Sequence, residues 1–268
     1  MPDRPQQLWW TGTDIEGITS RPRVAIVGSR KATRYGRTVT QDIASTLAAR
    51  GVVIISGLAF GIDSYAHSAA LRASGCTVAV LPSPLDKIYP AAHHSLAARI
   101  LKNDGALVSE YASGTDIYSS SFIARNRIVS ALADVLLITE AAKASGTMHT
   151  ARFALEQGKT VMAVPGNITS PASEGCNNLI KSGAVPATGA DDVFFALGIK
   201  APAASPVKVS ADDPGQQLVL DLISQGIEGQ EELALAAKLP GQQVSTTLTS
   251  LELQGYIRPT GGGNWTVA

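Results

Sequence analysis

A run of apolar residues that leads into a glycine, a serine and two cations is the first stretch able to do chemistry. Residues 24–27 are Val-Ala-Ile-Val, and Gly28, Ser29, Arg30 and Lys31 follow them directly. A buried strand, a tight turn and a helix start favour an anion, because free backbone N–H groups and the helix dipole point at the turn. The glycine spacings of dinucleotide-binding and P-loop proteins are missing. The stretch therefore predicts an anion site without indicating NAD or ATP.

Two further glycine-bearing turns accompany this one. Ser56 and Gly57 begin the turn 56–61 after a second apolar run, and Gly146 and Thr147 stand where another predicted helix begins. Each turn lies at the carboxyl end of a predicted strand. Ligands of open α/β sheets bind beyond these ends, so we expect the three turns to converge on one pocket.

An aromatic residue and two arginines form a second candidate group. Its members are Phe122, Arg125, Asn126 and Arg127. Phe122 and Arg125 share a face of a predicted helix, whereas Arg127 points elsewhere. A flat ring beside a guanidinium can stack an unpaired base and hold its phosphate. The alternative is that Phe122 belongs to the core and the arginines pair with Asp134 or Glu110.

Metal chemistry and acid–base chemistry receive little support. His67 follows Asp63 at i, i+4, where a structural hydrogen bond is expected, and no histidine combines with carboxylates at a zinc spacing. Asp63 and Glu140 could act as acid or base, but no nucleophile accompanies them. We therefore predict no metal, no cofactor and no catalytic residue. Cys76 and Cys176 have no partner at metal spacing and are predicted to be free thiols in a reducing compartment.

The elements that must position these residues alternate along the chain. Strands are predicted over 24–27, 52–55, 77–81, 106–109, 135–138 and 160–164, and helices over 38–50, 62–73, 95–103, 119–132 and from the Gly146 turn to 157. The strands are short and apolar throughout, without period-two patterning. This alternation predicts a mostly parallel sheet covered on both faces, that is, an α/β doubly wound, Rossmann-like domain.

Two shorter parts flank the Rossmann-like domain of residues 21–197. Residues 1–20 show no periodicity long enough for an element and are predicted to be an arm whose Trp9 and Trp10 cover apolar surface. Residues 198–214 are rich in Pro, Ala and Ser and are predicted to be a linker. Residues 215–268 hold three predicted helices and a small hairpin. This last pattern predicts a winged-helix-like domain.

Charge is distributed unevenly although the formal net charge of the chain is zero. Residues 21–200 hold 18 Lys and Arg against 12 Asp and Glu, whereas residues 201–268 hold 3 against 7. The central domain is therefore the basic part and permits a polyanion partner. The candidate recognition helix, 242–249, has no Lys or Arg. Protein contact or structural packing is thus favoured over duplex binding for the terminal domain.

Composition indicates a compact globular protein, with 45% hydrophobic and 16% charged residues among 268. No apolar run is long enough to span a membrane, and the first residues lack the layout of a secretory signal. We therefore expect a cytoplasmic protein without a membrane partner.

Seven motifs occur in the order found in the DprA/Smf family, the DNA-processing proteins of bacterial transformation. They are Val27-Gly28-Ser29-Arg30; Ser56-Gly57-Leu58-Ala59-Phe60-Gly61-Ile62-Asp63 with Ala66-His67; Tyr89-Pro90; Ser109-Glu110-Tyr111; Phe122 with Arg125-Asn126-Arg127; Glu140 with Ser145-Gly146-Thr147; and Val164-Pro165-Gly166. The resemblance covers roughly residues 21–197. The linker and the winged-helix-like domain also fit that family's layout.

The resemblance implies an extended Rossmann domain that binds single-stranded DNA, forms a homodimer and delivers the strand to the RecA recombinase. It implies a protein that protects incoming DNA and is not an enzyme. By this resemblance Gly28, Ser29 and Arg30 are the phosphate cradle, Phe122 is the base-stacking aromatic, and residues 125–127 are the pocket wall. Ile123 stands where the family usually has Pro, and only the arm 1–20 stands where family members commonly have an additional N-terminal domain.

A second hypothesis is a Rossmann-like enzyme that acts on a nucleotide or nucleoside phosphate. Phosphoribohydrolases resemble this chain in the turn at Gly146 and Thr147, which precedes a helix. They have a Pro-Gly-Gly lead-in and a Glu shortly after the Thr. Here Met148, His149 and Thr150 follow instead, and the missing carboxylate argues against hydrolysis.

Overall fold

The structure is a computed structural model that describes residues 3–199, 213–261 and 263–267. The chain divides into two compact units, Met1–Ala201 and Pro202–Ala268, and each is described by itself. Residues 200–212, which make up most of the predicted linker, lie outside the described residues.

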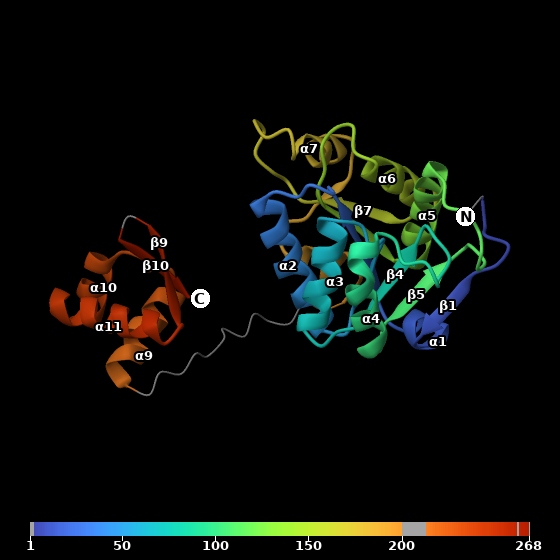
Figure 1. The fold of residues 1–268 in the computed structure, drawn as a ribbon. Coiled ribbons are helices and arrows are strands. Elements are labelled where there is room, and N and C mark those ends of the chain that lie inside the picture. The colour runs from blue at the N-terminus through green and yellow to red at the C-terminus, as the bar shows by residue number, and fades with distance from the viewer. Residues whose placement is uncertain (1–2, 200–212, 262, 268) are drawn as a thin grey trace. The chain divides into compact units, whose positions relative to one another are not determined.

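The first unit is built on an eight-stranded sheet with the order β1-β5-β4-β3-β2-β6-β7-β8 (Figure 1). Its strands are β1 (Trp9–Gly12), β2 (Arg23–Gly28), β3 (Val53–Ser56), β4 (Thr77–Leu81), β5 (Ala106–Ser109), β6 (Val135–Glu140), β7 (Thr160–Ala163) and β8 (Val185–Pro186). All neighbouring pairs are parallel except β1 with β5. The predicted doubly wound, mostly parallel sheet is confirmed.

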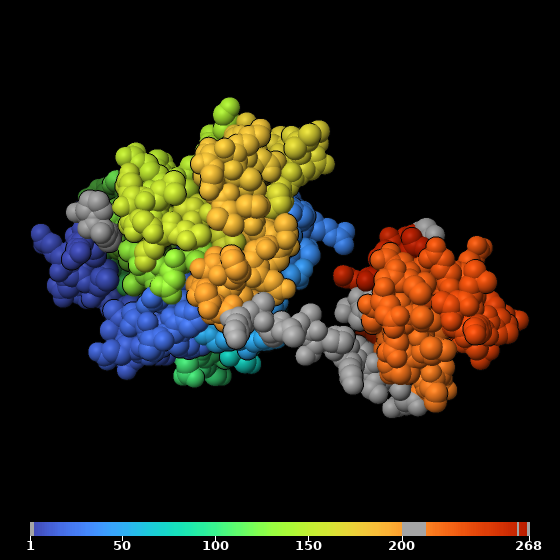
Figure 2. Space-filling model, turned by 180° about the vertical axis from the view of Figure 1, so that it is seen from behind, coloured from blue at the N-terminus to red at the C-terminus, as the bar shows by residue number. Residues whose placement is uncertain are grey.

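Helices cover both faces of this sheet, as Figure 1 shows. They are α1 (Ile15–Thr19), α2 (Arg34–Ala49), α3 (Ile62–Arg72), α4 (His94–Lys102), α5 (Ser119–Leu132), α6 (Thr147–Glu156), α7 (Glu174–Lys181) and α8 (Ala190–Ala196), with a 3-10 turn at Ala91–His93. The apolar positions of α2 fall at four-residue spacing, so Ile43 and Leu47 are buried on one face. Figure 2 shows the unit from behind, with the yellow and amber segments that follow α6 packed side by side.

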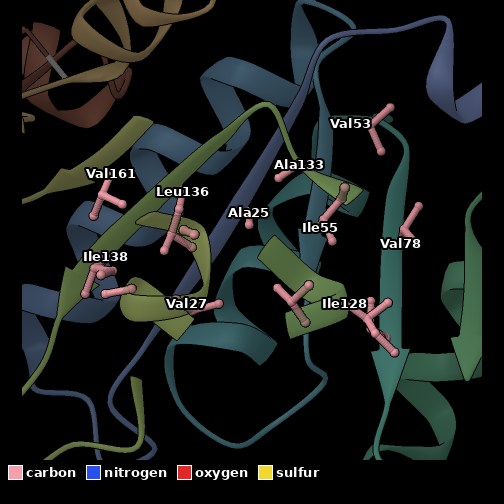
Figure 3. Close-up of a cluster of buried hydrophobic side chains, with 14 of the residues drawn as sticks. Ala25, Val27, Val53, Ile55, Val78, Ile128, Ala133, Leu136, Ile138 and Val161 are labelled. Atoms are coloured by element: carbon pink, nitrogen blue, oxygen red, sulfur yellow. The ribbon is translucent and has the colours of Figure 1, made fainter. Parts of the chain in front are cut away.

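Two apolar layers hold the helices to the sheet. Figure 3 shows the layer on the side of α5, to which Val27, Ile55 and Ile138 of three strands and Ile128 of the helix belong. The other layer joins α2, α3 and α8 to the opposite side chains of the same strands, such as Ile26 and Leu137. Because both faces are covered, successive residues of each central strand are buried, and this produces the continuous apolar runs of the sequence.

The N-terminal residues form elements that the sequence analysis did not predict. The expectation of an arm without an element is wrong, because β1 pairs antiparallel with β5 and the helix α1 follows it. Trp10 packs against the apolar layer on the α5 side, and its indole N–H donates to Thr13 O at 2.5 Å. A four-residue strand at a sheet edge is too short to leave a periodic pattern, so its pairing depends on β5 rather than on its own sequence.

The described residues of the second unit form three helices and a two-stranded sheet. Its elements are α9 (Pro214–Ser224), α10 (Gln230–Ala237), α11 (Gly241–Leu253), β9 (Ile257–Gly261) and β10 (Asn264–Val267). Leu220, Leu233, Leu248 and Ile257 belong to its core. This arrangement confirms the predicted winged-helix fold.

No described helix is both long and apolar enough to cross a membrane. The part of the chain that the structure describes also has no cluster of three His, Cys, Asp or Glu residues able to hold a metal ion. Cys76 and Cys176 are both buried and free, as expected.

Candidate nucleic-acid interface

A cleft of about 750 Å³ lies at the carboxyl ends of the central strands. The order of the sheet reverses there, because β2 has β3 on one side and β6 on the other. Ten of the twelve predicted site residues line it, namely Gly28, Ser29, Arg30, Lys31, Gly57, Phe122, Arg125, Asn126, Gly146 and Thr147. The three glycine-bearing turns thus meet at one cleft, as the strand ends predict.

Arg30 and Phe122 form a cation–π contact in the cleft. The guanidinium carbon of Arg30 lies 5.4 Å from the centre of the Phe122 ring. Arg30 is exposed, and Phe122 is half-buried and lies outside the hydrophobic cores. The alternative that Phe122 is a core residue is therefore wrong. A cation over the face of an aromatic ring is attracted by the ring quadrupole, which holds both groups at the surface of the cleft.

An aromatic pocket of about 40 Å³ adjoins the cleft. Phe60, Tyr89 and Phe122 line it, and the Tyr89 and Phe122 rings meet edge to face at a centroid distance of 5.0 Å. Phe60 is 48% exposed and Tyr89 is 44% exposed, so large apolar rings face solvent beside Arg30. The predicted site did not include Phe60 and Tyr89. The signal that could have found them is an aromatic residue in each of two loops that follow strand ends.

Arg125 lines the cleft but is almost wholly buried in its wall. Its side chain is buried, with 4% of the residue exposed, and Nη1 donates to the carbonyl oxygens of Gly57 and Val80. Burial lowers the pKa of Arg125 to about 10, whereas the nearby Asp63 opposes that shift and Arg30 adds to it. A Cβ atom at Gly57 would collide with this guanidinium, so the turn can pass over Arg125 only because Gly57 has no side chain.

Asp63 holds the same turn from the other side. Its Oδ2 accepts from the backbone N–H groups of Gly57 at 3.1 Å and Ala59 at 3.3 Å. Burial raises the pKa of Asp63, and the positive charge of Arg125 acts in the opposite direction. The pair therefore fixes both the carbonyl and the N–H of Gly57, which is a structural use of the carboxylate that the sequence had offered as an acid or base.

Two predicted site residues, Arg127 and Ser56, are not among the described residues that line the cleft. The Arg127 guanidinium is buried and pairs with Glu110, and its Nε lies 3.1 Å from Asp3 Oδ2. The Ser56 hydroxyl donates to Ile26 O at 2.6 Å inside the sheet. Pairing with Glu110 is the alternative role expected for the arginines, and Arg127 has this role.

The turn after β2 uses most of its backbone N–H groups internally. Ser29 N donates to Glu140 O at 2.7 Å, Lys31 N to Ser29 Oγ at 3.1 Å, and Thr33 N to the Glu140 carboxylate at 3.0 Å. A Cβ at Gly28 would lie 2.6 Å from Glu140 O, so this glycine is required for close packing against β6. The positive character of the turn therefore comes from the exposed side chains of Arg30 and Lys31 rather than from a backbone cradle.

The turn before α6 forms another part of the cleft wall. Thr147 N donates to Ser145 Oγ at 3.2 Å, and the N-cap residue Gly146 has no side chain of its own to accept from the helix. Gly146 is exposed, and a Cβ there would meet nothing within 4 Å. The first turn of α6 thus presents the positive end of its helix dipole at the cleft.

His67 has a structural role, but with a different partner from the one predicted. Its Nδ1 is hydrogen-bonded to Thr77 Oγ1 at 2.7 Å rather than to Asp63. The ring is fully buried, and burial lowers the pKa of His67 to about 3, with His93 and Arg125 adding to the effect. His67 is therefore a neutral core residue that joins α3 to β4.

Comparisons with known proteins identify two family models along the chain. The model for DNA recombination-mediator protein A matches residues 1–198, and the model for the DprA winged helix domain matches residues 200–263. The putative DNA processing protein DprA of Mycobacterium tuberculosis is 36% identical over 98% of this chain and 69% of its own length. Protein Smf of Escherichia coli is 41% identical over 90% of this chain and 67% of its own length.

Solved structures of similar proteins include two that share this fold. DNA processing protein A of Streptococcus pneumoniae is 36% identical, with a TM-score of 0.65 over 70% of this chain and 65% of that one. The structure of DNA processing protein A of Helicobacter pylori, described for its single-stranded DNA binding mode, is 34% identical, with a TM-score of 0.67 over 74% of this chain and 89% of that one. The chain spans about two thirds of the length of the Mycobacterium, Escherichia and Streptococcus relatives.

Proposed function

The chain belongs to the DNA recombination-mediator protein A family, and from this premise we propose that it binds single-stranded DNA without sequence preference in the cleft described above. The observation that carries the proposal is the exposed Arg30 guanidinium over the Phe122 ring. Proteins that bind single strands combine cations that follow the phosphates with aromatic rings on which bases stack. Arg30 and Phe122 supply one group of each kind at the same point.

The neighbouring residues extend this arrangement in two directions. Lys31 adds a second exposed cation on the phosphate side, and Phe60 and Tyr89 add exposed rings on the base side. Both rings line the pocket that Arg30 and Phe122 share. We infer that the phosphates lie over Arg30 and Lys31 and that one base stacks on the exposed side of the aromatic group. The positive end of the α6 helix dipole, which lies at the cleft beside Gly146, would attract a further phosphate of the same strand.

Fluorescence anisotropy with a labelled oligo-dT tests DNA binding directly. We expect unlabelled oligo-dT to compete at least about tenfold better than a duplex of the same length. A base in a duplex must break its base pair before it can stack on a protein ring, whereas an unpaired base does not. Equal competition by the duplex would overturn the proposal. The exposed face of α11, with Gln242, Ser245 and Thr246, has no Lys or Arg, so we do not expect the winged-helix unit to raise duplex affinity.

We further propose that the protein acts in the cytoplasm as a homodimer, protects incoming DNA and delivers it to the RecA recombinase without being an enzyme itself. The family assignment supports this role. Light scattering at micromolar concentration tests the dimer, and the rate of RecA assembly on protein-coated oligo-dT tests delivery. Incubation with nucleoside monophosphates tests the enzymatic hypothesis, and robust release of free base would contradict the binding role.

A further inference from the structure

We propose that Glu140 is a specificity-determining residue, whose carboxylate occupies the anion position at the start of α2 and keeps nucleotide phosphates out of it. The inference goes beyond DNA binding, because it concerns which phosphate compounds the fold rejects. α2 follows β2, the strand at which the strand order reverses. In doubly wound proteins that bind dinucleotides, the pyrophosphate lies at the N-terminus of this helix.

An internal anion already occupies that position. Glu140 is the last residue of β6 and is only 2% exposed. Its carboxylate accepts hydrogen bonds from the Thr33 backbone N–H at 3.0 Å and from the Thr33 hydroxyl, and Thr33 is the N-cap of α2. A Cβ at Gly36 would lie 2.6 Å from Glu140 Oε2. The carboxylate therefore lies directly against the first turn of the helix.

The charge of Glu140 has the partners that a bound phosphate would have. No Lys, Arg or His among the described residues forms an ion pair with it within 4.0 Å. The negative charge is instead stabilised by a backbone N–H, a hydroxyl and the positive end of the α2 dipole. A buried carboxylate without a cationic partner requires such contacts to remain charged.

Two consequences follow for ligand choice. A pyrophosphate at α2 would have to displace a buried side chain and would meet a fixed negative charge, so the site rejects it on volume and on charge. Phosphates are directed instead to the exposed cations Arg30 and Lys31, which lie in the same turn but outside the helix start. Such an open surface suits the spaced phosphates of a polynucleotide better than the compact diphosphate of a single nucleotide.

Titration calorimetry with inorganic pyrophosphate tests the inference. We expect Glu140→Ala to bind pyrophosphate at least about tenfold more tightly than wild type, because the helix start is then vacant. The comparison is repeated in an Arg30→Ala background to remove binding by that cation, and the gain is expected to persist there. Glu156→Ala is the charge-matched control, since Glu156 is on the exposed face of α6 and pairs only with Arg152 among the described residues. It is expected to leave pyrophosphate affinity unchanged.

A second variant keeps the test decisive if Glu140→Ala does not fold. Glu140→Gln preserves the shape and the acceptor for Thr33 but removes the charge, and we expect pyrophosphate to bind about threefold more tightly than to wild type. Equal affinity for wild type and a folded Glu140 variant would overturn the inference, as would a gain of the same size in Glu156→Ala. Oligo-dT binding is measured on the same samples. Its absence in wild type would contradict the proposed DNA function and leave the pyrophosphate result to be judged separately.

Discussion

The guanidinium carbon of Arg30 lies 5.4 Å from the centre of the Phe122 ring, and this contact joins the turn after β2 to the first turn of α5. The two groups come from two different elements that both line the cleft, so neither element alone could provide the pair. A phosphate on Arg30 and a base on Phe122 would be held at adjoining positions. Phosphate binding by Arg30 and base stacking by Phe122 can be measured separately, and both can be distinguished from the effects of residues that only support the fold of the cleft.

Phe122→Ala is expected to weaken oligo-dT binding by about tenfold, in line with about 1–3 kcal/mol for one base stacked on an aromatic ring. Its effect on an abasic oligonucleotide of equal length is expected to be small, because that ligand has no base to stack. Anisotropy titrations with both ligands give the comparison. Phe122→Tyr is the matched control and should keep the preference for oligo-dT. An equal loss for both ligands would show that Phe122 acts on the phosphates or on folding.

Arg125→Ala is expected to destabilise the protein by about 2–6 kcal/mol, because it leaves the buried carbonyl oxygens of Gly57 and Val80 without the guanidinium donor, at about 1–3 kcal/mol each. Urea unfolding measures this loss. The remaining DNA binding should keep the wild-type salt dependence, since Arg125 touches Gly57 and Val80 rather than a phosphate. A reduced salt dependence with unchanged stability would instead place Arg125 on the DNA.

The stability of the protein is expected to fall as the pH decreases below about 6.5, because of His67. The pKa of the folded-state ring is about 3, so the unfolded chain takes up a proton that the folded chain excludes. The contribution is fully present above pH 6.5 and is lost toward pH 3, at about 1.4 kcal/mol per pH unit. Urea unfolding at several pH values should show that His67→Gln has a shallower slope than wild type. The buried Asp63 titrates in the opposite sense in both proteins, so the difference between their slopes isolates His67. Identical slopes would contradict the buried neutral ring.

The central strands were predictable because each is a short apolar run, and the three turns because each holds a glycine after such a run. The strands β1 and β8 were not, since four and two residues leave no pattern and their pairing depends on the neighbouring edge strand. Among the predicted site residues, the sequence does not distinguish a buried arginine from an exposed one at positions 30 and 125. Only the packing of α5 over the Gly57 turn shows that Arg125 is buried while Arg30 is exposed. The aromatic pair of Tyr89 and Phe122 likewise depends on where a long loop folds.

The salt dependence of oligo-dT binding tests the central claim most directly, measured for wild type, Arg30→Ala and the control Arg152→Ala, whose cation is on the exposed face of α6. If a phosphate lies on Arg30, the Arg30→Ala substitution should weaken oligo-dT binding by about tenfold. It should also reduce the slope of log affinity against log salt by about 0.7, which is the value for one released counterion on a single strand. Arg152→Ala should leave both quantities at their wild-type values. An Arg30→Ala protein that binds within about twofold of wild type across the titration, with an unchanged slope, would contradict the account.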